Sequence, residues 1–256
     1  MLRQMTLMAV PGIPDVHHGD DVGRLIIRAL EETGYPLGDG DVVVVAQKIV
    51  SKAEGRKVAL ADVTPSPEAL EWARRTRKDP RLVELILRES NQVLRARPGL
   101  MIVEHRLGFV CANAGIDHSN VCPGNESDEW VLLLPEDPDR SAERIRETLR
   151  AHFGVDVAVL IADSHGRAWR LGAVGTAIGV AGMCPLMDLR GRRDLYGRPL
   201  RVTRVGTADG IAAAAALLMG EADEGTPVVI VRGAPHEPGV GRLADILRPR
   251  ELDLFR

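Results

Sequence analysis

The sequence predicts an α/β fold of the mixed α+β kind, in which strands and helices alternate along the chain. Apolar runs suited to buried strands occur at 42–46, 131–135, 157–163 and 226–233. Between them lie segments with apolar residues at helical spacing, each bounded by a capping residue or by a turn that contains Gly or Pro. Alternation of this kind is typical of a sheet covered by helices.

The helices are expected in the following order. Asp20 or Asp21 caps a helix that runs through Ile26, Ile27 and Leu30 and ends at Gly34. Four more follow, three of them with a Ser or Asp cap and Pro in the first turn and the last rich in Ala, at 66–75, 79–90, 137–154 and 208–221. The last residues, 248–256, are predicted to be a surface tail.

Composition limits the class of protein. No linker, low-complexity tract or repeat divides the 256 residues, so we expect one domain over 1–256, or two subdomains that are interleaved in sequence. The net charge of -3 gives no general attraction to nucleic acid or to an anionic membrane. No apolar stretch is long enough for a membrane span. The three cysteines, Cys111, Cys122 and Cys184, lack zinc spacing, which favours reduced thiols and a cytoplasmic location.

Three segments carry oxygen ligands suited to Mg²⁺ or Mn²⁺. The loop GFVCANAGIDHSN contains Asp117 with Asn113 and Asn120 on a backbone of small residues, which can approach phosphate oxygens closely. Asp163 and Ser164 stand directly beyond a buried strand, and Glu221 follows the Ala-rich helix. The alternatives stay open: Asp117 as a turn or cap residue, and Glu221 as part of a solvated acidic turn. His165 is less favoured as a ligand, because hard cations prefer oxygen.

A basic group follows the strand at 42–46. Gln47, Lys48, Ser51 and Lys52 stand where loops present polar groups to ligands, and Lys52 is a candidate phosphate partner. The P-loop pattern is absent, and an exposed lysine is the alternative. The arginine-rich stretch 189–204 suits an acidic substrate, or is a solvated basic loop. The glycines of GAVGTAIGVAGM suit close backbone packing more than a cofactor.

In combination these motifs resemble a known family. PGIP, DGDVVVVAQKIVSKAEGR, KDPRLVELILRES, GFVCANAGIDHSN, IADSHGRAWR and MGEADEGTP occur in the order seen in the F420-0 gamma-glutamyl ligase family (coenzyme F420:L-glutamate ligases), over about residues 10–233. The resemblance implies a GTP-dependent ligase that adds L-glutamate to coenzyme F420-0, first at its lactyl carboxylate and then through gamma-linked additions. It also implies two divalent cations, Mn²⁺ or Mg²⁺, assistance by K⁺, and an intertwined homodimer with an unusual two-part fold.

The same resemblance assigns roles to residues of this chain. Asp117 and Asp163 match ligands of a first metal, and Ser164 and Glu221 match ligands of a second. The residues implied to contact GTP are Pro11, Gly12, Ile13, Pro14, Gln47, Lys52, Asn120, Met219, Gly220, Ala222, Asp223, Glu224, Gly225 and Thr226. Two positions depart from the pattern: Ser164 replaces the common Thr, and His165 stands where an aromatic or amide residue is frequent.

The expected chemistry is transfer of the GTP gamma-phosphoryl group to the acceptor carboxylate. The acyl phosphate formed in this way is then attacked by the amine of glutamate. No residue is identified as the general base. The alternatives are a related GTP-dependent ligase acting on another acidic acceptor and a non-catalytic GTP-binding sensor.

Overall fold

The central sheet of the protein is formed from strands far apart in sequence. The structure is a computed structural model that describes residues 4–121 and 129–254. The sheet has the order β1 (Thr6–Ala9), β13 (Val228–Arg232), β2 (Val42–Ala46), β8 (Ala158–Arg167) and β9 (Arg170–Ala181). Only β2 and β8 are parallel neighbours, paired from Val42 with Ala158 to Ala46 with Ala162. The sheet is therefore mixed, as the predicted α+β class allows.

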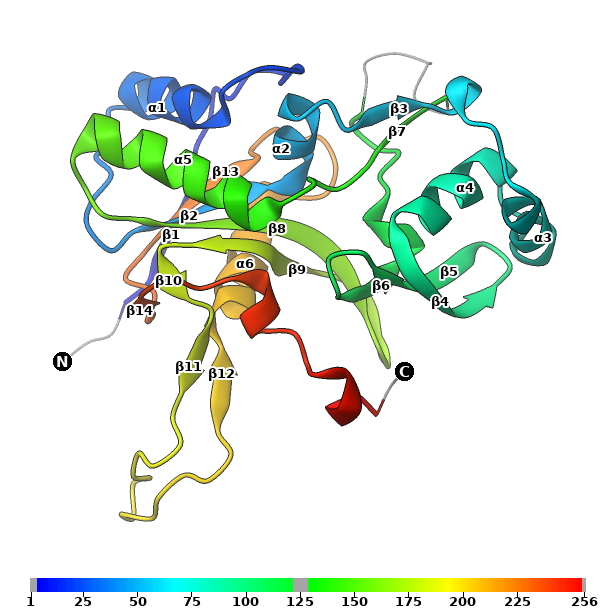
Figure 1. Cartoon of the computed structure of the whole chain (residues 1–256). Helices are drawn as coiled ribbons and strands as arrows, with labels where there is room; N and C mark the ends of the chain where they lie inside the picture. The colour runs from blue at the N-terminus through cyan, green and yellow to red at the C-terminus, as the bar shows by residue number, and fades with distance from the viewer. Residues whose placement is uncertain (1–3, 122–128, 255–256) are drawn as a thin grey trace.

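Helices cover both faces of this sheet (Figure 1). On one face lie α1 (Val22–Thr33) and α5 (Pro138–Phe153), and on the other lies α6 (Thr207–Met219). Alternate residues of β2 divide between the two faces: Val43 and Val45 join the α1 and α5 core, whereas Val42 and Val44 join the α6 core. The uninterrupted valine run is thus explained by a strand that is buried on both sides.

The predicted caps are present. Asp21 accepts a hydrogen bond from the backbone N–H of Arg24 at the start of α1, and Gly34 ends the helix in the left-handed region. Asp137 and Gly154 play the same roles for α5. These local signals explain why the helix limits could be predicted closely from the sequence.

The glycines of β9 allow the helices to approach the sheet. A Cβ added to Gly175 would lie 2.6 Å from the carbonyl oxygen of Ala212 in α6, and one added to Gly179 would lie 2.5 Å from that of Pro138 in α5. Both distances are too short for any side chain. The close-packing role predicted for this glycine-rich stretch is confirmed.

A second group of elements, here called the small lobe, flanks the sheet on the side of β8. It contains α3 (Pro67–Thr76), α4 (Pro80–Arg88), β4 (Ser90–Arg97), β5 (Leu100–His105) and β6 (Val110–Ala112). The pair β3 (Lys57–Ala59) and β7 (Trp130–Leu132) runs between the lobe and the rest of the chain. One hydrophobic cluster includes both Val45 of the main sheet and Ile86 of the lobe, so the two parts share a core.

An arm projects from the other side of the molecule (Figure 1). Its strands are β11 (Leu186–Asp188) and β12 (Arg204–Gly206), and β10 (Met183–Cys184) pairs with β14 (Glu237–Pro238) near its base. Short helices complete the fold: α2 (Gln47–Ala53) and the 3-10 turns η1 (Leu60–Asp62), η2 (Asn113–Gly115), η4 (Leu243–Asp245) and η5 (Arg250–Leu252).

Several sequence expectations need correction. The strand expected at 157–163 continues to Arg167 and turns back as β9, which was not predicted. The strands β4 to β6 were also missed, and the strand expected at 131–135 is β7, Trp130–Leu132. The basic stretch 189–204 forms most of the arm. β4 and β9 contain charged residues or glycines and β6 has only three residues, so the apolar-run criterion does not detect them. β5, with the sequence LMIVEH, is an apolar run that this criterion should have detected.

Candidate active site

The predicted site residues meet at one edge of the central sheet. The backbone N–H of Val10 donates to the carbonyl of Val228 (2.9 Å), and that of Ala46 donates to the carbonyl of Pro227 (2.8 Å). Ala46 is also in register with Ala162 of β8. The segments 11–14, 47–52, 163–164 and 219–226 therefore gather at the edge of the sheet where β1 and β2 end, β13 begins and β8 passes Ala162. The sheet topology alone brings these distant segments together.

Asp117 is the most strongly held of the predicted metal ligands. Its Oδ2 accepts a hydrogen bond from Gln47 Nε2 at 2.6 Å and lies 3.0 Å from the ammonium of Lys48. Ser51 fixes Gln47 in turn, through a 2.8 Å hydrogen bond from its hydroxyl to Oε1. The start of α2 therefore sets the orientation of the Asp117 carboxylate.

Asp163 lies close enough to Asp117 for their charges to interact. Burial raises the pKa of Asp117 above its usual range; Lys48 opposes this shift, and the like charge of Asp163 adds to it. Burial and the Asp163 carboxylate also raise the pKa of the Cys111 thiol to about 12. The cysteine is thereby kept protonated and unreactive, and the two carboxylates form a partly buried anionic pair.

Ser164 and Glu221 form a separate pair. Successive strand residues point to opposite faces, so Asp163 shares the face of Ile161 while Ser164 shares that of Ala162, which packs in the α6 core. The Ser164 hydroxyl donates to the Glu221 carboxylate at 2.5 Å, and both residues are exposed. The two predicted metal-ligand pairs thus lie on opposite faces of β8.

The predicted nucleotide residues line the same edge. Lys52, at the end of α2, forms a 2.8 Å ion pair with Asp15, the residue directly after Pro14. The side-chain amide of Asn120 donates to the carbonyl of Ala222 at 2.9 Å and so joins the Asp117 loop to the 219–226 turn.

That turn is closed by its own hydrogen bonds. The Glu224 carboxylate accepts from the N–H of Ala222, and the Thr226 hydroxyl donates to the carbonyl of Leu218. Gly220 ends α6 with φ 72°, and Met219, Asp223 and Gly225 complete the segment. Pro11, Gly12, Ile13 and Pro14 follow β1, and Gly12 has φ 81°.

The donor set can be tested against the cations that the resemblance implies. Carboxylate and hydroxyl oxygens suit Mg²⁺ and Mn²⁺. A cation would offset both the burial of the Asp117 carboxylate, which is the main cause of its raised pKa, and the smaller repulsion by Asp163. Within the described ranges, no three His, Cys, Asp or Glu side chains cluster as a complete protein cage. Mg²⁺ in nucleotide sites commonly uses one or two carboxylates with phosphate oxygens, so the residues present fit such a group.

Sequence reasoning missed two contributions to this site. Lys48, for which the sequence predicts no specific role, contacts Asp117, and its ammonium lies 3.3 Å from the Ser119 hydroxyl. His165 was judged less suitable than the oxygen ligands, yet its Nε2 lies 3.0 Å from Asp163 Oδ2. The sequence could have indicated that His165 lies near Asp163, because side chains two positions apart on a strand point to the same face.

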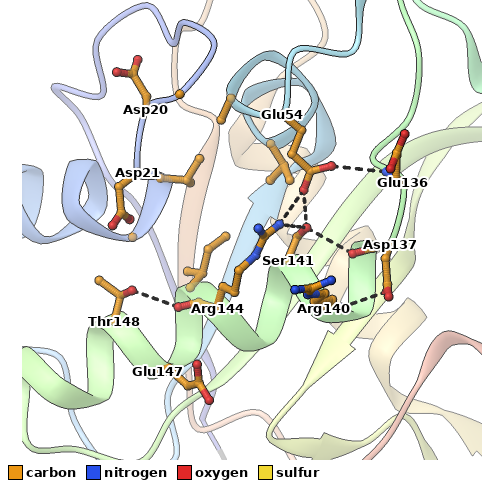
Figure 2. A pocket seen from close by; sticks show the side chains of 16 residues that line it. Asp20, Asp21, Glu54, Glu136, Asp137, Arg140, Ser141, Arg144, Glu147 and Thr148 are labelled. Carbon is orange, nitrogen blue, oxygen red and sulfur yellow. Dashed lines mark hydrogen bonds and ion pairs between the residues drawn. The ribbon is translucent and has the colours of Figure 1, made fainter.

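A prominent cleft lies away from these residues (Figure 2). It has a volume of about 740 Å³ and opens between α1, the end of α2 and α5, with Glu54, Ser141 and Arg144 linked on its wall. Its lining includes none of the predicted nucleotide or metal residues. The candidate site therefore lies outside this cleft, and the side chains of Asp117, Asp163 and Lys52 identify it.

Two further features concern the cysteines and the helices of the described residues. Cys111 and Cys184 are free thiols, and Cys122 lies outside the described residues. Over residues 4–121 and 129–254, every helix is too short or too polar to cross a bilayer.

Comparison with known proteins gives one consistent result. The model of the F420-0:Gamma-glutamyl ligase family matches residues 12–233. A coenzyme F420:L-glutamate ligase of Methanothermobacter thermautotrophicus is 54% identical over 98% of this chain and 99% of its own length. Proteins of the same name from Methanopyrus kandleri and Archaeoglobus fulgidus are 48% and 43% identical, over 100% and 99% of this chain and 99% and 97% of their own lengths. The chain is therefore an enzyme of the F420-0:gamma-glutamyl ligase family.

Proposed function

We propose that this enzyme uses GTP to join L-glutamate to the lactyl carboxylate of coenzyme F420-0 and then extends the product by gamma-linked glutamates. One observation carries the proposal: the Asp117 and Asp163 carboxylates, the Lys48 and Lys52 ammonium groups and the 219–226 turn meet at a single sheet edge. Anionic and cationic groups at such proximity suit a nucleotide with its metal ions.

The reaction proceeds in two displacements. A carboxylate oxygen of the acceptor attacks the gamma-phosphorus of GTP, the bond to the bridging oxygen breaks, and GDP leaves. The amine of glutamate, after losing a proton, attacks the acyl carbon; the C–O bond breaks and phosphate leaves. The protein contributes chiefly by positioning anionic groups that would otherwise repel one another.

Each group of residues has a role in this scheme. Lys52 binds the nucleotide phosphates, and the segments 11–14 and 219–226 with Gln47 and Asn120 enclose the nucleotide. Asp117 and Asp163 hold one divalent cation, Mg²⁺ or Mn²⁺, while Ser164 and Glu221 hold another. Such cations, when bound, neutralise the crowded phosphate charges and polarise the transferred group. K⁺ assists at this centre.

The proposed enzyme is a homodimer of the cytoplasm. Support for a dimer comes from large apolar side chains that are exposed on the arm and on α6: Leu195 is 98% exposed, Tyr196 89% and Leu217 85%. Exposed apolar groups of this size favour a protein contact. The free thiols of Cys111 and Cys184 agree with a reducing compartment.

The decisive experiment is product analysis. Purified enzyme is incubated with F420-0, L-glutamate, GTP and Mn²⁺, and the products are identified by mass spectrometry. Glutamylated F420 with stoichiometric GDP and phosphate is expected, and omission of GTP or of the cation should prevent it. Turnover only with another acidic acceptor would favour the related ligase, and GTP binding without turnover would favour a sensor.

A further inference from the structure

His165 lies beside Asp163, and neither the nucleotide nor the metal assignments give it a role. The two residues are separated by one position on β8 and share a face of the strand. His165 Nε2 lies 3.0 Å from Asp163 Oδ2, and the two side chains are 14% and 11% exposed. An imidazole nitrogen is thus held next to a carboxylate that the proposed function assigns to a cation.

The short distance is not a hydrogen bond. His165 Nε2 is buried and has no hydrogen-bond partner among the described residues, although it lies 3.0 Å from Asp163 Oδ2. A buried polar nitrogen without a partner costs about 1–3 kcal/mol, which a ligand can recover. The ring is positioned by Phe109, whose centroid is 5.2 Å away and which stacks in turn on His105 at 5.0 Å.

The distance agrees with two ligand atoms on one metal ion. In octahedral coordination at about 2.1 Å, neighbouring ligand atoms are separated by about 3 Å. A neutral imidazole nitrogen and a carboxylate oxygen at this spacing form one edge of such an octahedron. Phosphate oxygens and water complete the coordination of cations in nucleotide sites, so a large protein cage is not required.

We propose that His165 Nε2 is a direct ligand of the divalent cation held by Asp163, and that it makes this centre selective for Mn²⁺ over Mg²⁺. The inference rests on the proposed function only in taking Asp163 as a metal ligand. Imidazole binds first-row transition metals in preference to Mg²⁺, which favours oxygen ligands. The nitrogen ligand therefore adds affinity for Mn²⁺ and little for Mg²⁺.

The test measures binding of Mn²⁺ alone to the whole chain, without GTP or acceptor. Pulsed electron paramagnetic resonance of the Mn²⁺-loaded protein should show coupling to a directly bound imidazole ¹⁴N. In His165→Phe the coupling should vanish and the Kd for Mn²⁺ should rise about tenfold, whereas the Kd for Mg²⁺ should change less than about twofold. Phe preserves the ring contact with Phe109, so the strand should keep its packing.

His152→Phe provides the matched control, because His152 is a surface residue whose Nε2 pairs with Glu31 at 2.9 Å. The ¹⁴N coupling and the Kd for Mn²⁺ should both be unchanged in His152→Phe. Absence of ¹⁴N coupling in the unmodified protein, or equal losses of Mn²⁺ and Mg²⁺ affinity in His165→Phe, would overturn the inference. Since no turnover is measured, failure of the proposed ligase activity gives a separate result.

Discussion

Asp163 and Ser164 are neighbours in the chain but lie in different environments. Asp163 faces the small lobe, is 11% exposed, and is surrounded by Asp117, Cys111 and His165. Ser164 faces α6 and pairs with Glu221 in an exposed position. Electrostatic interactions weaken with exposure to water, so the two sides of β8 should differ in how strongly they bind a cation. We therefore expect tighter cation binding on the Asp163 side of β8 than on the Ser164 side.

The largest expected effect is the loss of ligation activity when a carboxylate on the Asp163 side of β8 is removed. Asp117→Asn and Asp163→Asn should each reduce ligation at least about 100-fold, because a bound cation contributes several kcal/mol to the transition state. Steady-state assays over a range of Mn²⁺ concentration measure this. Ser164→Ala should retain more activity than either variant. Circular dichroism should confirm that any variant with lost activity is still folded. Near-normal turnover of Asp163→Asn at low Mn²⁺ would contradict the metal assignment.

The next effect concerns the stability of the small lobe, which borders the Asp163 side through Glu89 and its cationic neighbours. Burial by itself would raise the pKa of Glu89, but His105, Arg56 and Arg106 outweigh it and lower that pKa from 4.5 to about 2. A carboxyl group whose pKa is lowered in the folded state stabilises the fold at pH values above its pKa in the unfolded chain. That stabilisation is lost as the pH falls from about 5 toward 2. Glu89→Gln should therefore lower the free energy of unfolding near neutral pH by about 3 kcal/mol.

Urea denaturation of the parent protein and of Glu89→Gln across this pH range measures the effect. The free energy of unfolding should depend less on pH in Glu89→Gln than in the parent. Glu136→Gln is the control, since Glu136 also pairs with Arg56, at 3.4 Å, but is 69% exposed. A similar loss of stability in both variants would show that Arg56 and not the buried carboxylate controls the lobe contact.

Lys52 should give an intermediate effect on nucleotide binding. Its side chain is 16% exposed and paired with Asp15, so it can donate a charge-assisted hydrogen bond to a phosphate. Lys52→Ala should weaken GTP binding by about 1.5–3 kcal/mol, measured by calorimetry. Asp15→Asn removes the partner but retains the ammonium and should bind GTP at least as tightly as the parent. Unchanged affinity in Lys52→Ala would return this residue to the class of ordinary surface lysines.

The smallest effect is expected on the arm, which is more exposed than either side of β8. Arg192 lies 3.4 Å from Glu237, and Arg193 donates to the carbonyl of Gly197, within the arm itself. We expect the arm to hold the acidic precursor or its glutamate tail. Replacing Arg192 and Arg193 with Ala should then raise the KM for the precursor more than that for GTP, and added salt should reduce the difference. Unchanged precursor kinetics at low salt would leave the arm as an oligomer contact or a solvated surface.

Elements whose signals are local could be predicted from the amino-acid sequence alone. Capping residues such as Asp21 and Asp137 and the valine run of β2 specify helices and a buried strand through interactions within a few residues. The ordered motifs likewise indicated the family and the candidate residues around Asp117, Asp163 and Lys52.

Tertiary structure decided what depends on contacts between distant segments. The strands β4, β6 and β9 have weak local patterns and form because of their partners. The Gln47 and Lys48 contacts to Asp117, the separation of Asp163 from Ser164 by the faces of β8, and the approach of His165 all require the assembled sheet. Charge interactions and pKa shifts depend on distance and burial, and neither quantity exists until the chain has folded.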